Sequence, residues 1–259
     1  MKNLFKYIGL TSILLFSFYY TEKMSDIVIN NSSLVAEINE NSKDYNIEAV
    51  SAIIEDDYII PGLNGYTVNV FKSYDNMRFL DTFNSYYLEY DTISPNISLK
   101  NNKDKIVKYG NKNKKSVAII VENNIDIINY SKEKNIKKTR LINHESFENN
   151  VFYEQINNDA VEYKKVESML NNNNINKNVC VINNNLIDIC KKYEKYLVEP
   201  SLSLNNYNLA SIKDNIKSGY IISINDNVNV TDYKILVRQI YYQDLDIVSL
   251  SELITEERD

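Results

Sequence analysis

The sequence is poor in the residue types that most active-site motifs require. It has one histidine, five glycines, three prolines, two cysteines and no tryptophan among 259 residues. A zinc site made of two histidines and a carboxylate cannot be formed from a single imidazole. No glycine-rich phosphate loop, dinucleotide fingerprint or Gly-x-Ser-x-Gly nucleophile motif occurs. Turns must rely on asparagine and aspartate, which tolerate left-handed backbone angles better than other non-glycine residues.

The chain as a whole lacks an excess of positive charge, with 29 basic against 35 acidic residues. The net charge of -6 excludes the electrostatic footprint of a nucleic-acid-binding protein. Basic residues gather in two local runs, a pattern typical of solvated loops and a helix face. The alternative is a patch that faces anionic wall polymers or lipid headgroups. The runs are Lys103, Lys105, Lys108, Lys112, Lys114 and Lys115, then Lys132, Lys134, Lys137, Lys138 and Arg140.

The N-terminus has the order of a secretion signal. Lys2 and Lys6 precede an apolar run from Tyr7 to Tyr20. Bulky residues follow where cleavage would need small ones, so we expect residues 1–22 to be an uncleaved signal anchor, a single membrane helix with the body outside the cytoplasm. The alternative is a protein secreted after cleavage. Residues 23–45 are polar with little periodicity and are expected to form a stalk.

The two cysteines are ten residues apart. Cys180 lies in an expected strand and Cys190 in an expected helix. Outside the cytoplasm such a pair can form a disulfide worth about 2–3 kcal/mol in the chain-entropy model. The sequence favours this disulfide over two buried thiols.

The body of the chain reads as an α/β protein. Residues 46–112 suggest a small α+β element. From residue 113 to 259, strands alternate with helices, which predicts βα units and a parallel sheet, arranged as a small (β/α) barrel that is either complete or incomplete. Strands are expected at 116–121, 138–143, 179–182, 196–198, 220–224 and 247–250. Helices are expected at 125–135, 147–157, 161–170, 185–193, 212–217 and 231–242.

Several stretches are similar, in order and spacing, to the motifs of one enzyme family. They are 113–124, 137–150, 196–201, 216–226 and 242–256. These segments resemble the NodB-type polysaccharide deacetylases, in a divergent Firmicutes-type branch whose N-terminal extension is similar to residues 60–77. The resemblance spans about residues 46–256 and implies a barrel of the polysaccharide-deacetylase type.

The resemblance also implies a chemistry that this chain has largely lost. The family uses one aspartate as base, a second with two histidines as metal ligands, and a later histidine as acid. The base corresponds to Glu122 and the metal aspartate to Asn123. The later histidine corresponds to Asn225, its neighbouring aspartate is retained as Asp226, and a family arginine corresponds to Glu199. The histidine pair has no counterpart, so the resemblance implies no metal cofactor.

The candidate ligand-binding residues are Glu122, His144, Glu145 and Asp226. His144 follows the second strand and is either a surface histidine or a general base or sugar-binding group that Glu145 or Glu148 orients. A set of carboxylates from Glu122, Glu145 and Asp226 would suit Mg²⁺ or Ca²⁺ better than zinc.

Three functions remain open at this stage. The first is a catalytically inactive envelope homologue that binds a wall glycan or a partner protein. The second is an active deacetylase or hydrolase of N-acetyl sugars with a non-standard site. The third is a structural envelope scaffold. Fold analogy alone does not decide between them.

Overall fold

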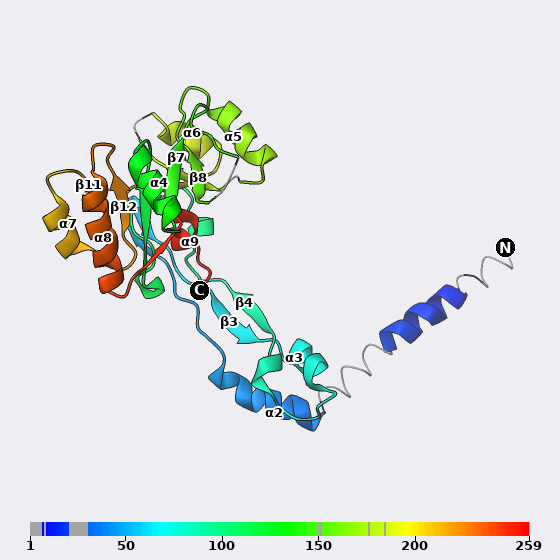
Figure 1. Ribbon diagram of the computed structural model, residues 1–259. Helices are drawn as coiled ribbons and strands as arrows, with labels where there is room; N and C mark the ends of the chain where they lie inside the picture. The colour runs from blue at the N-terminus through cyan, green and yellow to red at the C-terminus, as the bar shows by residue number, and fades with distance from the viewer. Residues whose placement is uncertain are drawn as a thin grey trace. The chain divides into compact units, whose positions relative to one another are not determined.

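The computed structural model describes residue 7 and residues 9–20, 31–149, 152–175, 177–183 and 185–258. The chain divides into two compact units, a smaller one of residues 1–48 and 65–93 and a larger one of residues 49–64 and 94–259 (Figure 1). The segment 46–112, expected as one element, is therefore shared between both units. Residues 9–20 are helical, and no helix within the described ranges has the length and apolarity to span a bilayer. The remainder of the expected anchor lies outside the described residues.

The smaller unit is a helical pair with a two-stranded sheet. Helix α2 (Ser33–Asn41) leads into the 3₁₀ turn η1 (Ser42–Asp44), and β3 (Gly65–Val68) pairs antiparallel with β4 (Tyr90–Ile93). Helix α3 (Val70–Met77) and the turn η2 (Ser85–Tyr87) complete it. Its hydrophobic core cluster consists of Leu34, Ile38, Val68, Met77 and Leu88. The prediction that residues 23–45 form a stalk is therefore wrong for residues 33–41, which form helix α2. Leu34 and Ile38 are four residues apart, so they share one face of this helix, and that face is buried.

The first sheet of the larger unit is entirely parallel and has the order β11-β12-β6-β7-β8, with β13 also on β6. Its central strand β6 (Ser116–Val121) is buried throughout. Both of its faces pack on core, which explains the continuous apolar run in the sequence. The other strands are β7 (Thr139–Ile142), β8 (Glu154–Asn157), β11 (Leu202–Leu204), β12 (Ile221–Ile224) and β13 (Asp246–Val248).

The second sheet has the order β1-β2-β5-β10-β9. Strands β1 (Ile53–Glu55) and β2 (Tyr58–Ile60) form an antiparallel pair, and β5 (Ile106–Val107), β10 (Tyr196–Val198) and β9 (Val179–Val181) continue it in parallel. A mixed α/β fold with parallel strands is therefore confirmed. Among the described strands, β8 and β9 belong to different sheets, as do β10 and β11, so hydrogen bonds do not close a single ring.

The helices of the larger unit follow the strands. Figure 1 shows α7 beside α8 near strands β11 and β12. Two of these helices have an asparagine as N-cap. The side chain of Asn124 accepts a hydrogen bond from a backbone N–H of α4, and that of Asn229 accepts one from a backbone N–H of α8. The helices are α4 (Ile125–Glu133), α5 (Tyr163–Asn172), α6 (Ile187–Lys192), α7 (Leu209–Asn215), α8 (Val230–Tyr242) and α9 (Leu250–Ile254), with 3₁₀ turns η3 (Leu99–Asn101) and η4 (Lys112–Lys114).

The helix expected at 147–157 is wrong, because residues 154–157 form strand β8. Its polar side chains are buried and hydrogen-bonded within the protein rather than exposed. Glu154 accepts from the hydroxyl of Thr139 at 2.7 Å, and the Gln155 amide donates to the carbonyl of Glu148 at 2.7 Å. The strand therefore lacks the apolar residues by which a buried strand is recognised. Strand β11 was not expected either.

Two further expectations concern charge and cysteine. Lys114, Lys138 and Arg140 are buried, so they are not part of a solvated basic surface. Cys180 and Cys190 form the disulfide that the sequence favoured, with their Cα atoms 6.2 Å apart, and it joins β9 to α6.

Candidate functional site

A pocket lies at the carboxyl ends of β6 and β12, the end at which parallel α/β folds place their sites. Its volume is about 300 Å³. Two carboxylates, one amide and one hydroxyl face an apolar wall. The lining residues are Glu122, Ser223, Asn225 and Asp226, with Ile120, Leu141 and Ile224.

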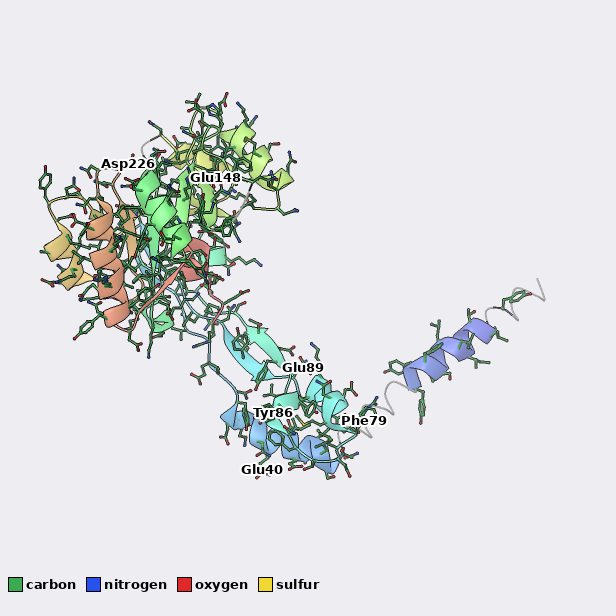
Figure 2. All side chains as sticks on the ribbon, viewed as in Figure 1. Glu40, Phe79, Tyr86, Glu89, Glu148 and Asp226 are labelled. Carbon is green, nitrogen blue, oxygen red and sulfur yellow. A yellow bond between two sulfur atoms is a disulfide. The ribbon has the colours of Figure 1, made fainter. Side chains whose placement is uncertain are left out.

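Asp226 is held by the loop that follows β6. The backbone N–H of Asn123 donates to its Oδ1 atom at 3.1 Å. The buried Asn124 side chain donates to the carbonyls of Asp226 and Val228 at 3.0 and 2.8 Å, while its oxygen accepts from the N–H of Ile127. Figure 2 labels Asp226 in this part of the larger unit. The buried side chain of Asn124 therefore caps the N-terminus of α4 and also holds the loop at residues 226–228.

Asn225 is positioned from the next strand of the sheet. The Ser203 hydroxyl donates to its Oδ1 atom at 2.9 Å, and its backbone N–H donates to the carbonyl of Leu204 at 3.0 Å. Because Oδ1 accepts from Ser203, the amide nitrogen is the group left to donate to a ligand. Asn225 therefore presents a neutral hydrogen-bonding group to the pocket.

Glu122 begins a row of hydrogen-bonded side chains that runs across the carboxyl ends of β6, β8 and β9. The Asn158 amide donates to Oε1 of Glu122 at 2.9 Å, and the Asn183 amide donates to Oδ1 of Asn158 at 3.2 Å. Sequence reasoning missed both asparagines. Asn158 directly follows β8, so recognising that strand would have placed it at the site.

His144 belongs to a separate cluster with Asp159 and Glu162. Its Nδ1 atom lies 2.9 Å from Oδ2 of Asp159 and 3.2 Å from Oε2 of Glu162, while Nε2 is 3.9 Å from Glu145. Asp159 is buried, and its Oδ1 atom accepts from the backbone N–H groups of Glu162 and Val161. The hydrogen bond from the Glu162 backbone, with help from His144, holds the pKa of Asp159 at about 2.

The predicted ligand-binding residues are thus divided. Glu122 and Asp226 line one pocket, whereas His144 and Glu145 lie together elsewhere, so the carboxylate set of Glu122, Glu145 and Asp226 is not assembled. The sequence suggested that Glu145 or Glu148 would orient His144. In the structure, the carboxylates nearest to its Nδ1 atom are those of Asp159 and Glu162.

Two other residues have structural partners. Glu148 pairs with buried Arg140 at 2.6 Å and accepts from Tyr153; burial raises the pKa of Glu148, but these hydrogen bonds outweigh it and lower that pKa. Glu199 accepts a hydrogen bond from Tyr58, which raises the pKa of the phenol.

The donor atoms of the pocket do not fit the metal centre of the family. That centre needs two imidazoles and a carboxylate, and the lining has carboxylates, an amide and a hydroxyl. Within the described ranges, one group of three could ligate an ion, with atoms of His144, Asp159 and Glu162 inside 4.8 Å of one another. In this group, the Oδ1 atom of Asp159 already accepts hydrogen bonds from two backbone N–H groups.

The low pKa of Asp159 predicts a pH-dependent contribution to stability. Replacing it with alanine is expected to lower the free energy of unfolding by about 1–2 kcal/mol at pH 7, because a buried charged acceptor is lost. A carboxyl whose folded pKa is depressed stabilises above its ordinary pKa of 3.8, and this contribution is lost as pH falls towards about 2. Urea denaturation at pH 7, 4 and 2.5 measures it. Asp214→Ala, at an exposed site, is the control; a deficit that does not narrow with acid would contradict the assignment.

No protein-family model and no curated protein sequence matches the chain. Among solved structures, it is similar to a wild-type CE4 family pseudoenzyme from Bacillus anthracis, with 19% identity over 87% of this chain and 96% of that chain and a TM-score of 0.59. A mutant of that pseudoenzyme, described as having restored enzymatic activity, gives 19% identity over 87% and 99% and a TM-score of 0.57. The resemblance indicated by the sequence motifs is therefore confirmed in the fold, which is that of the CE4 family, the NodB-type carbohydrate esterases.

Proposed function

We propose that this protein binds an N-acetylated wall glycan in the pocket at the ends of β6 and β12 and does not hydrolyse it. The observation that supports this proposal is the composition of the pocket. Glu122, Asp226 and Asn225 offer acceptors and a donor for sugar hydroxyls, and the wall formed by Ile120, Leu141 and Ile224 is suited to an acetamido methyl group.

The charge of the pocket argues against acetamide hydrolysis. The reaction develops an oxyanion, which needs a metal ion or aimed hydrogen-bond donors. The two ionisable residues of the lining are Glu122 and Asp226, and both are acidic. Glu122 is able to accept a proton from water, but two carboxylates would repel the developing negative charge. The pocket is therefore better suited to a neutral, hydroxyl-rich ligand than to an oxyanion.

The Cys180–Cys190 disulfide supports a location outside the cytoplasm, where such bonds persist. We therefore propose that the glycan is met on the outer side of the cell membrane. The expected anchor at residues 1–22, or secretion after cleavage, would bring the protein there. A partner protein in place of a glycan and a purely structural role are the competing functions.

Titration calorimetry of the full chain with N-acetylated chito-tetraose tests the binding proposal. We expect saturable binding that weakens about tenfold or more in Glu122→Ala/Asp226→Ala, because hydrogen bonds to charged groups contribute about 1.5–3 kcal/mol. Asp214→Ala should bind like the natural chain. Cello-tetraose, which is neutral and has a hydroxyl in place of each acetamido group, should bind more weakly because it lacks the methyl group that the apolar wall would contact.

Two outcomes would overturn the proposal. Absence of binding to chito-oligomers and to peptidoglycan fragments would favour a scaffold. Acetate release from the tetraose that is abolished by Glu122→Gln would establish an active deacetylase instead.

A further inference from the structure

We propose that the larger unit has a second binding site, at the amino ends of β6 and β12, which takes an amphipathic anion: an apolar chain or ring with one anionic head. A cavity of about 540 Å³ lies there, within the usual size of small-molecule sites. Its lining is Val50, Ser51, Ile53, Ile60, Pro61, Tyr109, Gly110, Asn111, Lys112, Asn113, Lys217, Ser218 and Tyr220.

The cavity is built around a close crossing of two backbones. Tyr109 and Tyr220 form an isolated antiparallel bridge, and their rings lie 5.1 Å apart, tilted by 45°. The N–H of Gly110 donates to the carbonyl of Gly219 at 2.7 Å. A Cβ atom on Gly219 would stand 2.4 Å from the Gly110 carbonyl oxygen, and its φ of +87° also favours glycine. Two of the five glycines of the chain thus hold this pair of tyrosines in place.

The apolar part of the wall comes from the edge of the second sheet. Ile60 ends β2 and Pro61 follows it, and Ile53 begins β1, which is the edge strand. The side chain of Ile53 is 54% exposed and that of Val50 is 37% exposed. Large apolar side chains open to solvent beside a cavity are a feature of binding surfaces, because covering them with an apolar ligand is favourable.

The charge of the rim selects an anion. Apart from the two tyrosines, the ionisable groups of the lining are Lys112 and Lys217, with no carboxylate among them. Neither lysine takes part in any of the ion pairs found between described residues. The Ser218 hydroxyl donates to the carbonyl of Lys112 at 2.7 Å, which ties the two lysine-bearing loops together. In a chain of net charge -6, this is a local basic rim above an apolar hollow.

The two sites lie at opposite ends of the same strands. The proposed glycan pocket follows the carboxyl ends of β6 and β12, and this cavity precedes their amino ends. Their linings share no residue, so each site can be removed without touching the other.

The experiment uses the absence of tryptophan from the chain. In the full chain, Ile53→Trp introduces a single indole at the cavity, and its emission is followed while dodecanoate is added below its micelle concentration. We expect a saturable blue shift as the indole loses water. In the same background, Lys112→Gln/Lys217→Gln should weaken dodecanoate binding about tenfold. Lys191→Gln/Lys192→Gln, which removes two exposed lysines of α6, should leave it unchanged.

Comparison ligands decide the chemistry. Dodecyltrimethylammonium and dodecyl maltoside should each bind at least tenfold more weakly than dodecanoate. An equal response to the cation, or no response of the indole to dodecanoate, would overturn the proposal. Glu122→Ala/Asp226→Ala should not alter dodecanoate binding, so failure of this site is distinguishable from failure of the glycan site.

Discussion

Tyr233→Ala should lower the free energy of unfolding by about 3–5 kcal/mol, the cost of deleting a large buried side chain. Tyr233 is fully buried within the core between α8, α4 and β6. Its ring meets that of Tyr130 edge-on with 6.1 Å between centroids, and its hydroxyl lies 2.9 Å from Oγ of Ser131. Alanine would remove this volume and leave Ser131 without its tyrosine partner. Urea denaturation followed by circular dichroism measures the effect.

The same helix offers a matched control. Tyr242 is 86% exposed, so Tyr242→Ala should change the stability by less than about 0.5 kcal/mol. Tyr233→Phe keeps the ring and loses the hydroxyl, which should cost about 1 kcal/mol. A Tyr233→Ala variant as stable as Tyr242→Ala would show that α8 does not pack as described.

The second large effect is a gain of stability. Lys138→Met should stabilise the protein at pH 7 by about 2 kcal/mol. Lys138 is 1% exposed, and burial, followed by repulsion from Arg140, lowers its pKa from 10.5 to about 8. That difference corresponds to about 3 kcal/mol of destabilisation when the amine is charged in both states. Two contacts of the amine together offset about 1 kcal/mol: a hydrogen bond to the carbonyl of Ile128 at 3.3 Å, and a cation–π contact with Tyr153, whose ring centroid lies 4.3 Å from Nζ.

The sign of the pH dependence shows whether Lys138→Met stabilises the protein by removing a buried charge or only by improving the packing. Between about pH 8 and 10.5 the unfolded chain holds a proton that the folded chain has released, so the stability contributed by Lys138 rises with pH. The advantage of methionine should therefore shrink over this range. Denaturation at pH 7 and 10 measures it, with Lys164→Met on the exposed face of α5 as control. A methionine variant less stable than the natural chain at pH 7 would contradict the prediction.

The same buried charges show what the sequence could and could not reveal. Strands β6, β9, β10 and β12 were predictable, because their runs of apolar residues are short and continuous. Lys138 and Arg140 were assigned to a solvated surface because their burial depends on Tyr153 and Glu148, which come from a segment expected to be a helix. Local charge patterns do not report such long-range partners.

The candidate site was predictable only where it follows apolar strands. Glu122 and Asp226 were found through the family resemblance of segments 113–124 and 216–226, which contain the recognisable strands β6 and β12. Asn158 and Asp159 were missed because β8 contains Glu154, Gln155 and Asn157, which are buried with hydrogen bonds to β7, to the loop at Glu148 and to helix α5. A polar strand of this kind has no hydrophobic period to detect.

The division of the chain also limits how it can be shortened. Residues 65–93 interrupt the larger unit in the sequence, so β1 and β2 come from a segment, residues 49–64, that lies between the two parts of the smaller unit. A fragment beginning at residue 113, where the βα repeats start, would lack β1, β2 and β5. One side of β10 would then lose its neighbour at Leu197 and Val198, and a bare apolar strand edge invites intermolecular pairing. Removal of residues 1–48, or excision of residues 65–93 with a short joining turn, would take away parts of the smaller unit and leave the strands of both sheets in the chain.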